Sequence, residues 1–261
     1  MKTGTVQSRP AECESLVYVG IDDTDNLESR GTGFRARQLA ARIIETGLGL
    51  VHGITRHQLF VSPEIPYTSH NSAACLAVTL GEAAAIRDLA AFCRVFLDKE
   101  SAPGSDAGFC IRSGSDVPDA VKDFGRKAKD TVLTAEDAHE LAEANGCHLE
   151  GVTGDHGGVI GALSSVGLRA GGVDGRFIWV QGLREMARTK LSLQSLLAGT
   201  GVDCVQTRDG RVLDDPREQI DLGEWPRPVL RVHMAALLVE ENDDLSHARW
   251  RVVPKDYIKR F

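Results

Sequence analysis

The chain has 261 residues, of which 42% are apolar and 26% are charged, and it carries a net charge of −7 with a pI near 5.6. This is the composition of a globular protein with length for one large domain or two joined ones, and no apolar run approaches the length of a membrane helix. The acidic balance argues against a protein that holds RNA unaided, because phosphate neutralisation supplies most of that affinity.

Residues 1–14 lack the apolar stretch of a secretory signal and are expected to form a disordered lead-in. Six cysteines are scattered along the chain without any Cys-x-x-Cys pair, and this spacing excludes a zinc ribbon. We therefore expect a cytoplasmic protein whose reduced thiols act as small core residues.

The first half of the chain alternates between β-branched runs and stretches with apolar residues at helical spacing. In chain order the expected elements are a strand at 15–21, a helix from 34 to 47, strands at 49–61 and 72–80, and a helix at 82–100.

The second half continues this alternation, but strands and helices do not follow one another as regularly as in a doubly wound sheet. The pattern predicts an α/β (α+β) fold of layered mixed sheets with flanking helices. The expected elements are strands at 107–113, 175–183 and 228–241, helices at 134–146, 158–172 and 184–198, a hairpin turn at Asp209-Gly210, and a closing strand and helix, or a lid, at 250–261.

Three aspartates, Asp22, Asp23 and Asp25, directly follow the strand at 15–21. Open sheets bind ligands at this end of their strands, and crowded carboxylates repel one another unless a cation lies between them. Because hard oxygen ligands suit Mg²⁺ and bridge it to phosphates, the trio predicts a magnesium site. The alternative is a turn or helix N-cap, where Asp is favoured without a metal.

The second candidate is the glycine-rich stretch 151–163, in which Gly157, Gly158 and Gly161 lead into an apolar helical pattern. Glycines let backbone N–H groups approach a phosphate, and a helix N-terminus favours an anion. The alternative is a tight connection without a ligand. His156, within this stretch, is expected to be a turn residue rather than an acid or base.

Two polar segments are candidates to complete such a site. The basic run around Lys127 could compensate phosphate charge, or it could be a solvated helix face. The segment 66–74 could orient a ligand, or its polar groups could only satisfy their own backbone. Its candidates for cofactor binding are Ser69, His70 and Asn71.

Taken together, these segments resemble a known family. The stretch GIDDTDNLESRGTG at 20–33 is similar to the opening Gly-Ile-Asp-Asp-Thr-Asp motif of the archaeal agmatinylcytidine synthetases, which modify an isoleucine tRNA. The stretch GGVIGALSSVG at 157–167 is close to that family's Gly-Val-Ile-Gly-Ala-Leu loop. Two less specific stretches, 62–76 and 124–146, lie between them in the family's order, so the resemblance covers about residues 16 to 185.

The resemblance implies an ATP-dependent catalytic core at 15–185, with a kinase-like and a ferredoxin-like part, and an extension at 186–261 packed on it. In that family, ATP and Mg²⁺ activate the C2 oxygen of a tRNA cytidine, which agmatine then displaces. By position, Asp22, Asp23 and Asp25 would hold Mg²⁺ on the triphosphate, Gly157, Gly158 and Gly161 would lie against the nucleotide, and Lys127 would steady developing phosphate charge.

The chain also departs from the family. Phe34 and Arg35 stand where the family has a Thr-Thr pair, and the resemblance includes neither the family's oligonucleotide-binding barrel nor its zinc ribbon. We therefore predict an ATP- and Mg²⁺-dependent enzyme that activates a small-molecule or nucleoside acceptor by phosphoryl or nucleotidyl transfer.

Two alternatives to this function stay open: a tRNA cytidine-modifying ligase that works with an RNA-binding partner, and a non-catalytic nucleotide-binding regulatory protein. The apolar strand at 228–241 could bury against a second copy as easily as in the core, so a homo-oligomer is also among the expectations.

Overall fold

The computed structural model describes residues 16–65, 67–68, 70–82, 84–242 and 248–261, so the predicted lead-in at 1–14 and Ser69 lie outside the described residues. Its strands are β1 (Leu16–Asp22), β2 (Gly49–Gln58), β3 (Ser72–Leu80), β4 (Gly108–Ser113), β5 (His148–Gly151), β6 (Arg176–Val180), β7 (Lys190–Ser192), β8 (Cys204–Thr207), β9 (Gln219–Asp221), β10 (Val229–Arg231), β11 (Met234–Glu241) and β12 (Trp250–Val252). Its helices are α1 (Thr32–Glu45), α2 (Ile86–Glu100), α3 (Asp119–Lys127), α4 (Ala135–Ala144), α5 (Val159–Gly171), α6 (Leu193–Gly199) and α7 (Lys255–Ile258).

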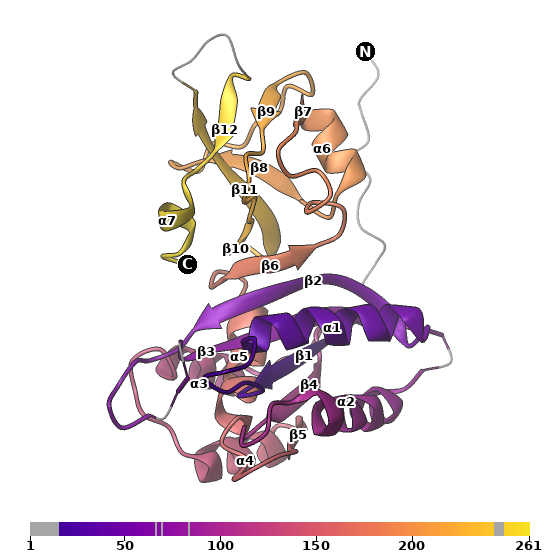
Figure 1. Cartoon of the computed structure of the whole chain (residues 1–261), viewed down its shortest axis with the longest axis vertical. Helices are drawn as coiled ribbons and strands as arrows, with labels where there is room; N and C mark the ends of the chain where they lie inside the picture. Colours follow the sequence, from indigo (N-terminus) through magenta and orange to yellow (C-terminus); the bar gives the residue numbers. More distant parts are fainter. Residues whose placement is uncertain (1–15, 66, 69, 83, 243–247) are drawn as a thin grey trace.

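One mixed sheet runs through the whole molecule in the order β5-β4-β1-β3-β2-β6-β10-β11-β12-β9-β7, with β8 paired to β11 (Figure 1). From β5 to β6 each strand is antiparallel to its neighbour. In this register Asp22, the last residue of β1, lies opposite Gly108 at the start of β4. The turn that carries the aspartates therefore emerges beside the segment that precedes β4.

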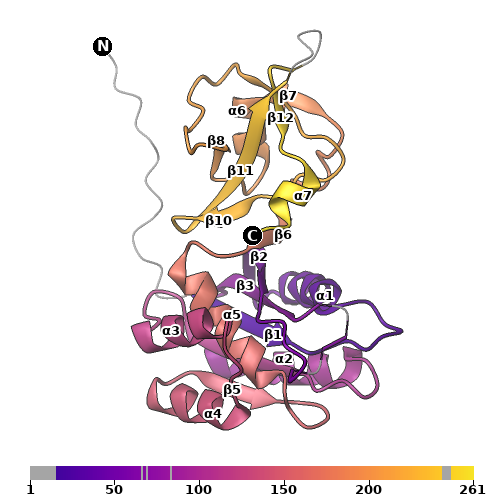
Figure 2. The same cartoon turned by 90° about the vertical axis from the view of Figure 1, so that its left-hand side faces the viewer.

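The lower part of the molecule has three layers (Figure 2). Helices α1 and α2 cover one face of the sheet, because a single stripe of each helix is apolar and buried. Helix α5 covers the other face, supported by α3 and α4. Nearly every residue of α5 is buried, as expected of a helix that is apolar all round. The N-terminus of α5 is thus held rigidly beside the end of β1.

The upper part, formed by β7 to β12 with α6 and α7, has an apolar core of its own (Figure 1). Strand β6 belongs to both parts. Its Phe177 and Val180 are buried in the upper core, whereas Ile178 is buried in the lower core and Trp179 packs against it. The predicted division at 185/186 remains a prediction.

The predicted α/β class with a mixed sheet and flanking helices is confirmed. The turn at Asp209-Gly210 is also present, with Gly210 in the left-handed region and its N–H donating to the Thr207 carbonyl at 3.0 Å. Among the five cysteines that the structure describes, all are free and four are buried. No helix in the described ranges is both long enough and apolar enough to cross a membrane.

Two predicted elements are wrong. The strand at 228–241 is a hairpin of β10 and β11, whose turn places Val232 and His233 at positive φ without glycine or proline to announce it. The helix at 184–198 is instead a turn, the short strand β7 and α6. Strand β5 is absent from the sequence-based prediction because it is short and only partly apolar, whereas α3 agrees with the solvated helix face that was the alternative for the basic run around Lys127.

Candidate active site

A cavity of about 280 Å³ opens where the end of β1, the loop between β2 and β3, the loop between α3 and α4, and the N-terminus of α5 meet. Its volume is just below the range of about 300 to 1,000 Å³ that is usual for ligand pockets. Most of the residues predicted from the sequence line it. They are Asp22, Asp23, Asp25, His70, Asn71, Gly157, Gly158 and Gly161, joined by Gly31, Thr32, Gly33, Arg56, Leu59, Ile65, Tyr67, Thr68, Ser72, Asp106, Ala128, Thr131, Leu133, Asp155 and Ile160.

Asp25 has a structural task at this cavity. One carboxylate oxygen accepts hydrogen bonds from the backbone N–H and the hydroxyl of Thr32, the first residue of α1, both at 2.9 Å. The other oxygen accepts the hydroxyl proton of Thr68 at 2.7 Å, which ties in the loop between β2 and β3. Asp25 therefore bridges the start of α1 and the loop between β2 and β3.

Asp22 and Asp23 carry the unusual electrostatics of the site. Burial raises the pKa of Asp22 to about 7, and the neighbouring Asp23 and Asp25 charges add to this rise. The pKa of Asp23 is raised to about 6, first by burial and then by Asp106, Asp25 and Asp155. Such shifts mark a carboxylate cluster that is short of positive charge.

The glycine loop meets these carboxylates directly. A Cβ on Gly161 would lie 1.7 Å from Oδ2 of Asp22, and a Cβ on Gly158 would lie 2.7 Å from the Asp22 carbonyl oxygen. Asp106 fixes the loop from the other side, since its carboxylate accepts the N–H of Asp155 at 2.8 Å and its carbonyl accepts that of Gly158 at 2.9 Å. The loop is both a tight connection and a wall of the cavity.

The opposite wall is apolar. It combines Leu59 and Ile65 from the loop after β2 with Ala128 and Leu133 from the loop after α3. These two loops are joined by a hydrogen bond of 2.9 Å from the N–H of Phe60 to the carbonyl of Ala128. The cavity therefore combines an acidic, glycine-rich wall with an apolar one.

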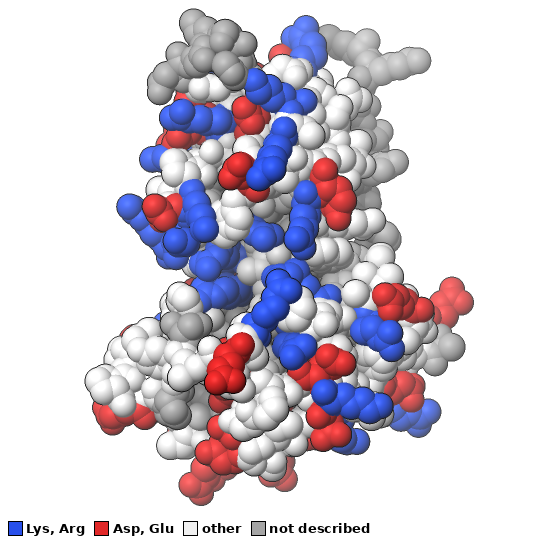
Figure 3. Space-filling view, viewed as in Figure 1, with Lys and Arg blue, Asp and Glu red and all other residues white. Residues whose placement is uncertain are grey.

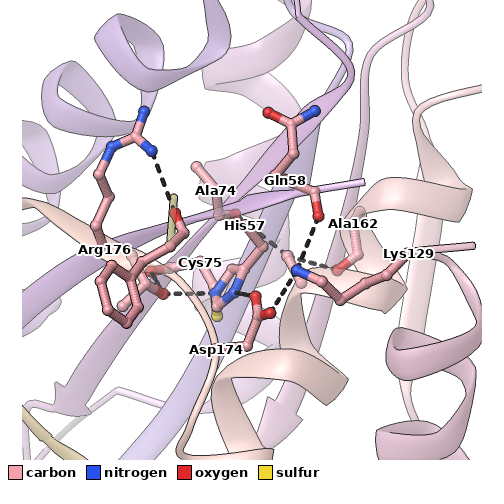
Figure 4. Close-up of polar contacts among 11 residues, drawn as sticks. His57, Gln58, Ala74, Cys75, Lys129, Ala162, Asp174 and Arg176 are labelled. Atoms are coloured by element: carbon pink, nitrogen blue, oxygen red, sulfur yellow. Dashed lines mark hydrogen bonds and ion pairs between the residues drawn. The ribbon is translucent and has the colours of Figure 1, made fainter. Parts of the chain in front are cut away.

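A buried network behind this wall holds the α3–α4 loop in place (Figure 4). His57 of β2 contacts Thr55 through Nε2 at 2.8 Å and Asp174 through Nδ1 at 2.9 Å. Asp174 also pairs with Lys129, whose Nζ donates to the carbonyl of Gln58 at 3.2 Å. The network thereby clamps the loop that supplies Ala128, Thr131 and Leu133 to the cavity.

Lys127 does not line the cavity. Its side chain is exposed on α3, where its charge acts on Asp137 of α4. The predicted contact of this lysine with phosphate has no support in the geometry, because the residue that lines the cavity here is the next one, Ala128, just after α3 ends. His156 also lies off the cavity wall, at a φ of 69° and against Gly151, consistent with a turn residue.

Arg56 and Asp106 are functional candidates that the sequence analysis misses. Arg56 lines the cavity and faces Asp22, and burial together with the Arg176 charge lowers its pKa to about 10. It places a positive charge at the cavity wall. No local pattern marks either residue, since both reach the cavity through the antiparallel pairing of distant strands.

The residues fit a hydrated Mg²⁺ carrying a nucleotide rather than a closed metal site. Within the described part of the chain, no group of three His, Cys, Asp or Glu side chains is arranged to hold a metal ion. Asp25 already accepts hydrogen bonds from Thr32 and Thr68, so a role for it as a third metal ligand stays a prediction. Mg²⁺ needs only one or two carboxylates when phosphates and water complete its shell, and Asp22 and Asp23 match that requirement.

Comparison with known proteins gives relatives for part of the chain. No family model matches it. An uncharacterized protein of Methanocaldococcus jannaschii is 29% identical over 155 residues, which are 58% of this chain and 49% of the relative. The tRNA 2-agmatinylcytidine synthetase TiaS of Cenarchaeum symbiosum, an enzyme named for an isoleucine tRNA, is 26% identical over 159 residues, which are 59% of this chain and 34% of the relative.

A crystal structure of TiaS in complex with its isoleucine tRNA and ATP matches with a TM-score of 0.51 and 26% identity over 59% of this chain and 36% of that one. The chain therefore spans about half or less of the length of the relatives it matches. Over that shared part, the chain is similar in sequence and fold to the core of the tRNA 2-agmatinylcytidine synthetases, as its motifs predicted.

Proposed function

We propose that the cavity binds ATP with Mg²⁺ and that the protein uses it to activate an oxygen of a nucleoside acceptor by phosphoryl or nucleotidyl transfer. One observation carries this proposal: two carboxylates with raised pKa values lie directly against the glycine-rich N-terminus of α5 and line a single cavity with it. The similarity to a protein solved with ATP and an isoleucine tRNA supports the same interpretation.

Each wall of the cavity has a task in this reaction. Asp22 and Asp23 would hold Mg²⁺, which supplies charge neutralisation to the phosphates. Backbone N–H groups at the start of α5 favour phosphate oxygens, and the Arg56 guanidinium adds the positive charge that phosphoryl transfer requires. The apolar wall with Tyr67 at its rim accepts a planar base. The acceptor oxygen would attack phosphorus as ADP or diphosphate leaves.

The direct test is a thermal-shift titration with ATP, with and without Mg²⁺. A ligand at about 100 times its Kd adds about 2.7 kcal/mol to the free energy of unfolding, which is a readable shift. We expect stabilisation by ATP with Mg²⁺, little by ATP alone, and none for Asp22→Asn combined with Asp23→Asn. If ATP with Mg²⁺ still stabilises the double variant, Asp22 and Asp23 do not take part in binding.

A measurement of turnover distinguishes an enzyme from the non-catalytic regulatory protein that the missing Thr-Thr pair suggests. An enzyme should release ADP or AMP when an RNA or nucleoside acceptor and a small amine are supplied together. Tight ATP binding without any product from either kind of acceptor would favour the non-catalytic alternative.

A further inference from the structure

The net charge of −7 conceals a local excess of positive charge. Figure 3 shows Lys and Arg side chains crowded at the waist between the lower and upper parts of the molecule. We call the arginines that the contacts place there the waist cluster. Its members are Arg30, Arg37, Arg176, Arg184 and Arg227.

The cluster is assembled from segments far apart in the sequence. Arg37 lies on α1, with its Nη1 3.9 Å from where a Cβ on Gly33 would stand, and Ile178 of β6 touches the same point at 3.1 Å. The Nη1 of Arg227 donates to the Ile178 carbonyl at 2.7 Å. Arg184 and Arg227 line one hollow, together with Trp179. Both parts of the molecule therefore contribute to a single basic surface.

Within the described ranges, acidic side chains do not pair with these arginines. Among the residues that the structure describes, none of the five is joined to an Asp or Glu by an ion pair, although Nη1 of Arg176 donates to the main-chain oxygen of Phe261 at 3.2 Å. The Nε atoms of Arg176 and Arg227 are buried without any hydrogen-bond partner. Burial and the charges of Arg37, Arg184 and Arg176 lower the pKa of Arg227 to about 10. Guanidinium groups held together against their own repulsion are typical of an anion site.

The cluster leads to the proposed active site. Gly33, beside Arg37, lines the cavity, and Arg56 inside the cavity is close enough to Arg176 for the two charges to repel. A single small anion would use two or three guanidinium groups at most. A group of five beside the cavity suits a chain of phosphates, and the partly buried ring of Trp179 adds a surface for stacking a base.

We propose that the waist cluster binds the phosphate backbone of a single-stranded or looped RNA and thereby directs one nucleoside into the cavity. This rests on the proposed function only in taking that nucleoside as the acceptor. The surface uses residues from β6 onward, so it would let this chain hold RNA through its own upper part rather than through a separate RNA-binding partner.

The test is the salt dependence of RNA binding, measured without ATP by fluorescence anisotropy of a labelled single strand of about 20 nucleotides, long enough to span several phosphate contacts. The test variant is Arg37→Gln with Arg184→Gln. The control is Arg42→Gln with Arg188→Gln, which removes the same charge from α1 and from the turn after β6. Both control arginines pair with a carboxylate, Glu45 and Glu224 respectively.

The wild type and the control should bind RNA at about 50 mM salt. The test variant should bind at least tenfold more weakly, and its plot of log K against log salt should be shallower by about 1 to 1.5, since each lost phosphate contact contributes about 0.7 for a single strand. All three proteins should keep the same thermal shift with ATP and Mg²⁺. A retained shift shows that the nucleotide cavity is intact, so a failure at the waist is distinguishable from a failure of the proposed function.

Three outcomes would overturn the proposal. They are no RNA binding by the wild type at low salt, an unchanged slope in the test variant, and binding of inorganic polyphosphate or polyglutamate as tight as that of RNA at equal charge. The last of these would reassign the cluster to polyanions without bases.

Discussion

Asp23 has a backbone φ of 53°, a left-handed conformation that asparagine adopts as readily as aspartate. Because its pKa is raised to about 6, the native protein binds a proton more tightly than the unfolded chain does between about pH 4 and pH 6. The contribution of Asp23 to the free energy of unfolding therefore falls as the pH rises through that window, and above it the ionised carboxylate destabilises the fold.

Asp23→Asn should consequently raise the free energy of unfolding at pH 8 by about 1 to 2 kcal/mol, less than the full linkage value because solvent screens the partly exposed carboxylate. Near pH 3.5 the change should be almost nil, and urea unfolding at both pH values measures the difference. Asp25→Ala is the matched control, because it removes an acceptor of three hydrogen bonds and should cost about 2 kcal/mol instead. Equal effects of the two changes would contradict the division of labour between these aspartates.

At the level of single residues, local pattern predicts only part of the candidate site. Asp22 and Asp23 lie at the end of an apolar strand, and Gly157 to Gly161 lie at the start of an apolar helix, so both can be placed at element ends without knowing the fold. Lys127 is a candidate because of its charge, but a shift of one residue along the helix decides whether a side chain points to the cavity or to the solvent. The sequence pattern does not predict the orientation of a helix about its axis that precisely.

Helix α5 offers a test of how closely its N-terminus must approach β1. Gly161→Ala would drive a methyl group into the Asp22 carboxylate, so we expect lower stability and loss of the ATP-dependent thermal shift. Gly171, in the same helix, has open space around its Cβ position, and alanine there should stabilise by about 1 kcal/mol. Melting of both variants with and without ATP and Mg²⁺ distinguishes a local clash from a general effect of alanine in α5.

Long periodic elements are predictable and short ones are not. Helix α2 and strand β3 can be predicted from apolar spacing alone, because the apolar residues of each buried face recur along the whole element. The hairpin at Val232 and His233 has the pattern of one strand, since neither residue is a usual turn former. The hydrogen bonds between β10 and β11 outweigh the extended backbone conformation that these two residues prefer locally. Sequence pattern alone does not show this.

For the whole molecule, the shared strand β6 predicts cooperative unfolding. Phe177 and Ile178 are adjacent residues buried in different cores, so neither part can lose its structure without exposing apolar surface of the other. We expect a single calorimetric transition whose calorimetric and van't Hoff enthalpies agree. Two resolved transitions, or a ratio well above one, would show that the parts unfold separately.

The average charge of the chain is a poor guide to its surface. A net charge of −7 argues against RNA, but charges act over about 10 Å at moderate ionic strength, so the local distribution decides which partners bind. The arginines of the waist cluster come from both parts of the fold and gather only when the sheet forms.

The double membership of β6 also constrains how this protein could be recombined with its relatives. A chimera that exchanged everything after residue 185 would keep Phe177 and Val180 from one parent and surround them with the upper core of another. A crossover between Gly172 and Asp174 would break the clamp on His57. The productive junction lies at Gly175, in the left-handed turn before β6, with a β2 chosen to match the incoming strand.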